Sequence, residues 1–150
     1  MAERPDIRLT AAEQAAYLRA NRKCALATLD KDGFPHVTAM NFVLRDGAFC
    51  MTSYGKAQKV VNIRRDPKVA IMVETGTAYA ELKGVMVRGL CEIIDGEDAV
   101  HEVWAWSAEQ RGESYKRPSG ASSSAPKRVV LKIVPQKTIS WDHSKLGGRY

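Results

Sequence analysis

The residues best suited to chemistry lie between an apolar stretch and a short basic segment. They are two hydroxyls, a glycine and the polar start of an expected helix: Thr52, Ser53, Gly55, Lys56, Gln58 and Lys59. Backbone N–H groups at a helix start, hydroxyls and ammonium groups together suit a phosphate. Lys56 and Lys59 are three residues apart, so they share a helical face. An ordinary strand-to-helix turn with a solvated basic face explains the same residues, and this stretch alone favours that simpler interpretation.

The elements that must position this stretch are mostly strands joined by tight turns. Asp32-Gly33 and Asp46-Gly47 are typical hairpin turns, and they predict an antiparallel meander. Thr10 followed by Glu13 predicts a capping box at the start of a first helix. Expected strands cover residues 23–29, 35–44, 48–52, 68–74, 79–94 and 128–142, and expected helices cover residues 10–19, 56–65 and 95–109.

Six mostly antiparallel strands in one domain of 150 residues predict a mainly β (α+β) fold, a closed barrel with peripheral helices. In the long strand, Gly84 and Gly89 can supply bends or bulges, and Asp95 can cap the helix that follows. Residues 111–127 are rich in Ser, Gly and Pro and predict a flexible loop, either a lid or an insert. The tail, residues 143–150, is too polar and Gly-rich to be core.

Composition narrows the function classes. The net charge is +6, but the basic residues are scattered, which argues against nucleic acid and permits an anionic small ligand. No apolar run reaches the roughly 18 residues of a membrane span, and no signal pattern is present, so we expect a cytoplasmic protein. Cys24, Cys50 and Cys91 are widely spaced, which predicts buried free thiols.

Common catalytic and nucleotide-binding motifs are absent from the sequence, including Gly-x-Ser-x-Gly, GxGxxG and Walker A. His36, His101 and His143 are isolated from one another, so no metal site is expected. We expect His101 at the surface, and His36 either in a pocket or as a structural residue. We expect Trp104 and Trp106 to be packing residues. Trp141, beside Asp142, His143 and Lys145, could line a ligand mouth or fold onto a partner subunit.

Two longer patterns resemble a known family. Ala27-Thr-Leu-Asp30 leads to Gly33-Phe-Pro-His36, and later Lys59-x-x-Asn-Ile-x-x-Asp-Pro-x-Val69 follows. Together with Val87-Arg-Gly89 and Trp141 they resemble the split β-barrel flavin and deazaflavin proteins typified by pyridoxamine 5′-phosphate oxidase. The resemblance covers about residues 10–142. It implies a six-stranded antiparallel split barrel and a homodimer, with the cofactor in a groove between the subunits.

Site residues follow from the same resemblance. Thr52 and Ser53 would hydrogen-bond the cofactor phosphate, Lys59 would be its charged partner, and Lys56 would assist. Gln58 stands where many flavin-binding members have an arginine, which weakens the expected grip on FMN. Trp141 and the tail would reach the other subunit's site. The edge of the tricyclic ring would be lined by second-strand residues, namely His36, Val37, Thr38, Ala39, Met40 and Asn41.

The tail sequence and the short chain look like the family members that use the deazaflavin coenzyme F420. The polyanionic tail of that coenzyme agrees with the basic balance of the chain. The resemblance therefore implies an F420-dependent oxidoreductase that transfers a hydride to a small organic substrate, with no catalytic residue required of the protein. FMN is the alternative cofactor. A non-catalytic F420- or flavin-binding protein, or a haem-binding relative with a histidine ligand, remains open.

Overall fold

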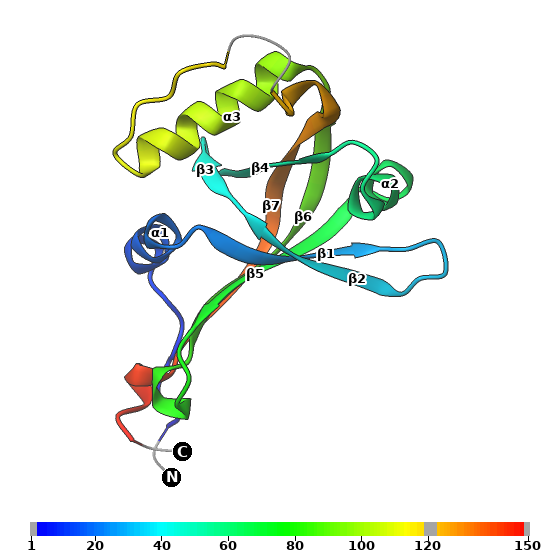
Figure 1. Cartoon of the computed structure of the whole chain (residues 1–150). Helices are drawn as coiled ribbons and strands as arrows, with labels where there is room; N and C mark the ends of the chain where they lie inside the picture. The colour runs from blue at the N-terminus through cyan, green and yellow to red at the C-terminus, as the bar shows by residue number, and fades with distance from the viewer. Residues whose placement is uncertain (1–2, 119–122, 149–150) are drawn as a thin grey trace.

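The computed structural model describes residues 3–118 and 123–148, and these form one curled antiparallel sheet with helices around it (Figure 1). The strand order is β2-β1-β5-β6-β7-β4-β3. This confirms the expected mainly β split barrel, although with seven strands. The elements are α1 (Ala11–Ala20), β1 (Lys23–Leu29), β2 (Pro35–Asn41), β3 (Val43–Arg45), β4 (Ala48–Tyr54), α2 (Gln58–Arg65), β5 (Lys68–Thr75), η1 (Tyr79–Glu81), β6 (Lys83–Ile94), α3 (Glu97–Gln110), η2 (Ala125–Lys127), β7 (Arg128–Asp142) and η3 (His143–Leu146).

The expectation of six strands was wrong because the predicted second strand breaks at Phe42. Along β2 inward and outward residues alternate, but Phe42 and Val43 are both buried, so the alternation fails there. The Phe42 ring packs against Phe49, with 5.3 Å between the ring centroids. Although β2 and β3 are consecutive, they form the two edges of the sheet. The chain at Phe42 therefore links the two edges, which curls the sheet into a half-barrel.

Several element boundaries also differ from the expectation. The long strand begins at Lys83, because Tyr79–Glu81 forms a short 3-10 helix. Gly96, at φ 104°, precedes α3, so Asp95 is not its cap and instead pairs with Arg64 at 3.1 Å. Gly89 lies at the bulge between β6 and β7, as predicted.

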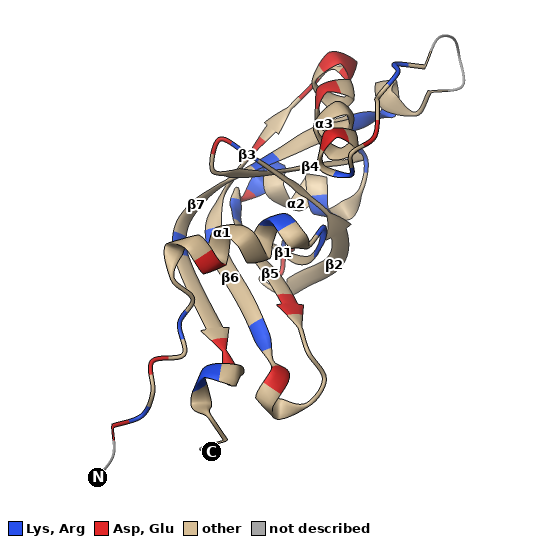
Figure 2. Cartoon of the chain, turned by 90° about the vertical axis from the view of Figure 1, so that its left-hand side faces the viewer, with Lys and Arg blue, Asp and Glu red and all other residues tan. Residues whose placement is uncertain are grey.

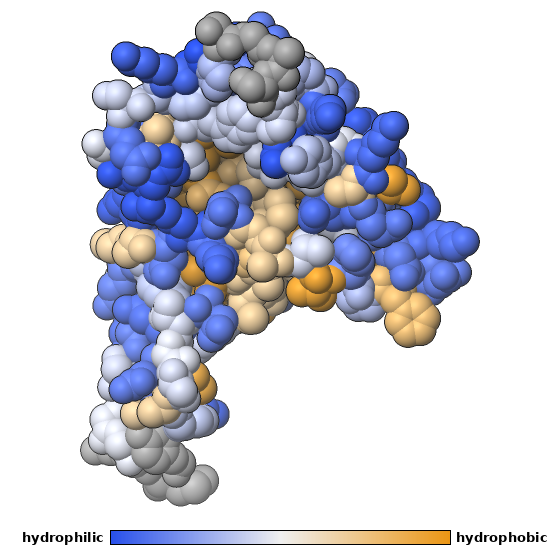
Figure 3. Space-filling view, in the orientation of Figure 1, coloured by the Kyte–Doolittle hydropathy of each residue, from blue (hydrophilic) through white to orange (hydrophobic). Residues whose placement is uncertain are grey.

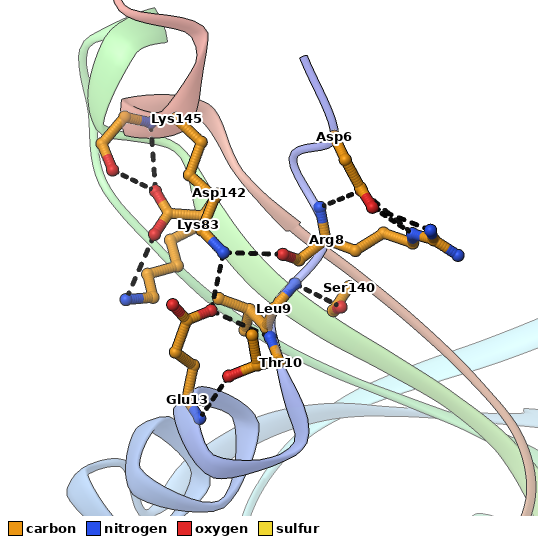
Figure 4. Close-up of polar contacts among 10 residues, drawn as sticks. Asp6, Arg8, Leu9, Thr10, Glu13, Lys83, Ser140, Asp142 and Lys145 are labelled. Carbon is orange, nitrogen blue, oxygen red and sulfur yellow. Dashed lines mark hydrogen bonds and ion pairs between the residues drawn. The ribbon is translucent and has the colours of Figure 1, made fainter.

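The predicted capping box at Thr10 is confirmed, and it belongs to a larger polar cluster near the chain ends (Figure 4). Lys145 Nζ lies 2.6 Å from a Glu13 carboxylate oxygen, and Lys83 pairs with Asp142 at 3.4 Å. Leu146, in η3, is buried, so the expectation that no part of the tail contributes to the core was wrong for this residue. The predicted tail beyond Gly148 lies outside the described residues.

The core has two parts. The larger fills the barrel interior with residues from β1, β4, β5, β6 and β7, and the smaller lies between the sheet and α3. In Figure 1, α3 crosses one end of the barrel, and α1 and α2 lie on either side of the strands. All three cysteines are buried free thiols, as predicted. Lysines, arginines and acidic residues are interspersed along the ribbon, as Figure 2 shows.

Candidate functional site

A pocket of about 720 Å³ opens beneath α3, and we call it the α3 pocket. Figure 3 shows an apolar hollow below the helix, bordered by hydrophilic side chains. The end of β2 and the middle of β4 form one wall, α3 forms another, and three arginines stand around it. The lining residues are Arg22, Ala39, Met40, Asn41, Phe42, Cys50, Met51, Thr52, Val103, Trp104, Ser107, Arg111, Tyr115 and Arg128.

The charge of the α3 pocket is positive, since its described lining includes three arginines and no carboxylate. Arg128 is fixed by two aromatic rings, because its Cζ lies 4.2 Å from the centroid of Tyr54 and 6.0 Å from that of Trp104. Its Nε donates a hydrogen bond of 3.2 Å to Ser124 Oγ. The remaining guanidinium N–H groups of Arg128 suit a carboxylate or phosphate oxygen.

The predicted hydroxyl Thr52 lies inside this pocket. Trp104 Nε1 donates to Thr52 Oγ1 at 3.3 Å, which ties α3 to β4. The hydroxyl hydrogen of Thr52 remains available to a ligand. Ser53 lies on the opposite face of β4, because successive strand residues alternate. It is 3% exposed, and its Oγ donates to the carbonyl of Tyr54 at 3.3 Å. The structure therefore separates the two hydroxyls that were predicted to share one phosphate.

A second pocket, of about 770 Å³, lies beside the turn that precedes α2, and we call it the turn pocket. Lys56, Arg64 and Lys127 line it, and Arg64 is paired with Asp95. Arg128 lines the turn pocket as well as the α3 pocket, so the two basic pockets meet at its side chain. The complete lining is Tyr54, Gly55, Lys56, Arg64, Asp95, Gly96, Pro126, Lys127, Arg128 and Val129.

The other predicted site residues are dispersed. Gln58 Nε2 donates to Asn62 Oδ1 at 2.8 Å, so this amide supports its own helix. Lys59 is half-buried on α2 and lines neither pocket. Ala39, Met40 and Asn41 reach the α3 pocket, whereas the earlier residues of β2, which are His36, Val37 and Thr38, do not line it.

Trp141 stands apart from both pockets. Its ring covers Gly84, where an added Cβ would clash with the indole, so Gly84 makes room for the ring rather than a bulge. Trp141 and Arg128 lie near opposite ends of β7, and thirteen residues of strand span roughly 40 Å along the chain. Within one chain, the structure does not bring Trp141 to Arg128.

Sequence reasoning missed the arginines, and it also misplaced His101. This histidine was expected at the surface but is 6% exposed, and its Nδ1 lies 2.5 Å from Tyr115 Oη. Its position on the same helical face as Trp104 and the buried Ala108, three and seven residues later, was the available signal. For Arg22, Arg111 and Arg128 no local pattern was available, because their convergence depends on the strand order.

Burial shapes the titration of several groups. It raises the pKa values of the Cys24 and Cys91 thiols to about 12 and also raises the pKa of Cys50, which lines the α3 pocket. Burial likewise raises the pKa of Tyr115, and nearby Arg117 opposes that shift. At neutral pH these groups are therefore protonated, so Cys50 offers the pocket no thiolate nucleophile.

Comparisons with known proteins identify the fold and the family. The sequence model of the pyridoxamine 5′-phosphate oxidase family matches residues 10–142. The chain therefore belongs to that family, and it has the family's split-barrel fold. A conserved hypothetical protein from Mycobacterium tuberculosis is 36% identical, with 100% of this chain and 95% of that one covered and a TM-score of 0.82. No curated protein matches.

Two further proteins of known structure are similar to this chain and are described by a cofactor, F420 or FAD. An F420 reductase is 26% identical to this chain, with 83% of this chain and 94% of the reductase covered and a TM-score of 0.66. An FAD-binding protein from Mesorhizobium loti is 27% identical, with 88% of this chain and 93% of that one covered and a TM-score of 0.65. The chain is thus similar to an F420 reductase and to an FAD-binding protein.

Residues 3–118 and 123–148 hold neither a metal-binding cluster nor a membrane-spanning helix. No group of three or more His, Cys, Asp and Glu side chains is placed to hold a metal ion. No helix in these ranges has the length and apolar character needed to cross a membrane.

Proposed function

We propose that this protein is an F420-dependent oxidoreductase that reduces a small organic substrate. The observation that carries the proposal is the junction of two basic pockets at Arg128, beside Ala39–Asn41 of β2. A planar ring would lie against β2 and Trp104 in the α3 pocket, and the anionic remainder would pass Arg128 into the turn pocket. The similarity to an F420 reductase supports the same assignment.

The residues present fit such a cofactor. The α3 pocket combines apolar walls for a ring, such as Met40 and Val103, with the donors Thr52 and Ser107. When bound, the reduced deazaflavin supplies the hydride, and the protein binds, orients and excludes water. Arg128 would hold an anionic group at the mouth between the two pockets, while Trp104, fixed by Thr52, would set the plane of the ring.

The turn pocket favours F420 over the alternative cofactor FMN. FMN carries a single phosphate, which Arg128 and Thr52 would satisfy. Lys56 and Lys127 in the turn pocket would then have no ligand charge to meet. The acidic tail of F420 provides that charge, so the two cofactors differ in how many cations they engage.

Separate fluorescence titrations with F420 and with FMN test this assignment. We expect F420 to bind more tightly than FMN, with an affinity that falls as salt is added, because exposed cations such as Lys56 and Lys127 are screened. Tighter binding of FMN would contradict the F420 assignment. Retention of F420 without substrate-dependent oxidation of its reduced form would show a binding protein without turnover. Binding of haem with a Soret band, but of neither cofactor, would favour the haem-binding alternative.

We also propose a homodimer whose partner covers the outer face of the sheet. Strand pairing aligns an apolar row across five strands, Ala39, Ala25, Met72, Met86 and Ile139. Met72 and Ile139 are 38% and 43% exposed. Since Ala39 also lines the α3 pocket, this row is continuous with the pocket, and a second copy of the chain seated on it would close the groove.

Changing Met72 to Glu tests the dimer. A carboxylate at the centre of the apolar row would disfavour burial against a second copy, so we expect monomers in sedimentation equilibrium. Val61→Glu is the matched control, because Val61 is 48% exposed but lies on α2. A monomeric wild-type protein, or equal behaviour of both variants, would contradict this interface.

A further inference from the structure

We propose that Tyr115 is the proton donor of the α3 pocket and that His101 resupplies its proton. This inference rests on the proposed function, because it assigns the group that protonates the substrate of that same site. It adds a catalytic residue contributed by the segment that follows α3, and neither residue was among the predicted site residues.

The geometry places the donor in the pocket and its supplier behind it. Tyr115 lines the α3 pocket, and its Oη lies 2.5 Å from Nδ1 of His101. His101 is 6% exposed and lies edge-on to Trp104, with ring centroids 5.3 Å apart at 86°. His101 and Trp104 are three residues apart on α3 and share a face. The imidazole thus connects the phenol to the indole that borders the proposed ring position.

Tyr115 is held in place by the segment that carries it. After α3 the chain turns back, and the N–H of Glu113 donates to the carbonyl of Ala108 at 2.9 Å. Arg117 then pairs with Asp98 at 2.6 Å and with Glu97 at 3.0 Å, in the first turn of α3. Contacts on both sides of Tyr115 therefore fix its phenol against the helix.

The charges around the phenol support proton donation. Arg128, on β7, and Arg22, before β1, line the same pocket and make no ion pair with a carboxylate in the described part of the chain, so their positive charge faces the ligand next to Tyr115. Arg111, at the end of α3, also lines the pocket and pairs with Glu113 at 2.9 Å. The acidic side chains of this segment and of the first turn of α3 are paired with arginines, Glu97 and Asp98 with Arg117 and Glu113 with Arg111. An oxyanion formed on a substrate, or on Tyr115 itself, would be stabilised by these guanidinium groups. A phenol that is protonated at neutral pH can then donate.

The proposed step balances as follows. Hydride adds to one carbon of a polarised double bond, and the displaced π electron pair moves to the neighbouring atom or oxygen. That atom forms a bond to the proton of Tyr115 Oη, whose O–H bond breaks. The phenolate takes the proton on Nδ1 of His101 while Nε2 of the same ring takes a proton from water, so the imidazole stays neutral. The substrate gains two electrons from the reduced deazaflavin, whose ring releases one proton to solvent, so charge and protons are conserved.

The test uses an oxyanion that needs no cofactor. Binding of 4-nitrophenolate, followed by its absorbance shift, reports hydrogen-bond donation in the pocket of the cofactor-free protein. We compare wild type with Tyr115→Phe, His101→Gln and the control Tyr79→Phe. Tyr79 packs on His143, with ring centroids 4.5 Å apart, in a tyrosine–histidine pair that belongs to neither pocket.

We expect Tyr115→Phe to weaken 4-nitrophenolate binding at least tenfold, His101→Gln to weaken it less, and Tyr79→Phe to bind within twofold of wild type. The ¹⁵N chemical shifts of His101 should move in Tyr115→Phe and not in Tyr79→Phe. With F420-loaded protein and cyclohex-2-en-1-one, kcat of Tyr115→Phe should fall about 10²- to 10⁴-fold, with F420 affinity within twofold.

Wild-type affinity for 4-nitrophenolate in Tyr115→Phe would overturn the donor role, and so would a wild-type protein that does not bind this anion. Unchanged kcat in Tyr115→Phe would overturn the catalytic role. Failure of the proposed function is a separate result, because it is a failure of the wild-type protein to bind F420 in a parallel titration.

Discussion

Replacing Arg128 by Gln tests the binding site at its most informative residue. Arg128 lines both pockets, and its guanidinium also lies over two aromatic rings, those of Tyr54 and Trp104. In the described part of the chain it makes no ion pair with a carboxylate, so its charge is not committed to folding. Gln keeps a hydrogen-bonding end and removes the charge.

The expected loss of affinity follows from the bonds that Arg128 can make. A charge-assisted hydrogen bond to a ligand phosphate contributes about 1.5–3 kcal/mol. At about 1.4 kcal/mol per factor of ten, this predicts a dissociation constant for F420 raised roughly 10- to 150-fold. The loss of folding stability is smaller, about 0.5–1 kcal/mol, because it comes from cation–π stacking near the surface. The variant should therefore fold normally and bind poorly.

The assay is a fluorescence titration with F420 at low and at moderate salt, with Arg45→Gln as the matched control. Arg45 also stacks on a tryptophan of α3, with its Cζ 5.1 Å from the centroid of Trp106, but it lines neither basic pocket. We expect Arg45→Gln to bind within twofold of wild type. The salt dependence should be weaker in Arg128→Gln, since one cation no longer contributes.

The same titration distinguishes Arg128 from the residue favoured by the family resemblance. Lys59→Ala should weaken binding by about 1.5–3 kcal/mol if Lys59 is the charged partner of the phosphate. Lys59 lines neither pocket, so the geometry favours the larger effect at Arg128. Wild-type affinity in Arg128→Gln, with a large loss in Lys59→Ala, would refute the assignment of the cofactor to these pockets.

Two further predictions concern stability. Asn62→Ala should cost about 2 kcal/mol and lower Tm by about 4–8 °C in calorimetry, because Asn62 is fully buried and its Nδ2 donates to Thr28 Oγ1 at 3.0 Å; an unchanged Tm would contradict this. Burial raises the thiol pKa values of Cys24 and Cys91 from 9.0 to about 12. Below pH 9 these thiols should therefore not affect the free energy of unfolding. Above pH 9 that free energy should fall by about 1.4 kcal/mol per pH unit for each thiol, because the unfolded chain loses these protons first. Urea unfolding at pH 8 and 10 measures the decrease, and replacing both thiols by alanine should remove that part of it.

Local patterns predicted the elements that depend on neighbouring residues. The capping box at Thr10 and the glycine bulge at Gly89 were confirmed, because each follows from a few adjacent residues. The break at Phe42 was not predictable from the sequence. An unbroken apolar-rich run has the same local preference for strand whether it forms one strand or two strands at opposite edges of the sheet. Burial of both Phe42 and Val43 is a tertiary result.

The candidate site was predicted where it follows one strand and missed where it needs several. Thr52 was proposed from a recognisable strand-to-helix stretch, and it lines the α3 pocket. Ser53, its neighbour, was expected to act with it, and strand alternation places it on the other face. Lys56 lines the turn pocket together with Lys127. Lys127 lies far along the chain from Lys56, and no local sequence pattern indicated that the two would line one pocket.

The position of Arg128 depends on strand register more than on any local preference. Tyr54 pairs directly with Arg128 at the end of β4, and Thr52 pairs with Val130. Cross-strand partners face the same side, so this register points Arg128 toward Tyr54, Thr52 and α3. A slip of one residue would turn the guanidinium into the barrel interior, beside Leu131 and Ser53, where an unpaired charge is costly. The core residues of β7 therefore also fix the charge of the proposed cofactor site.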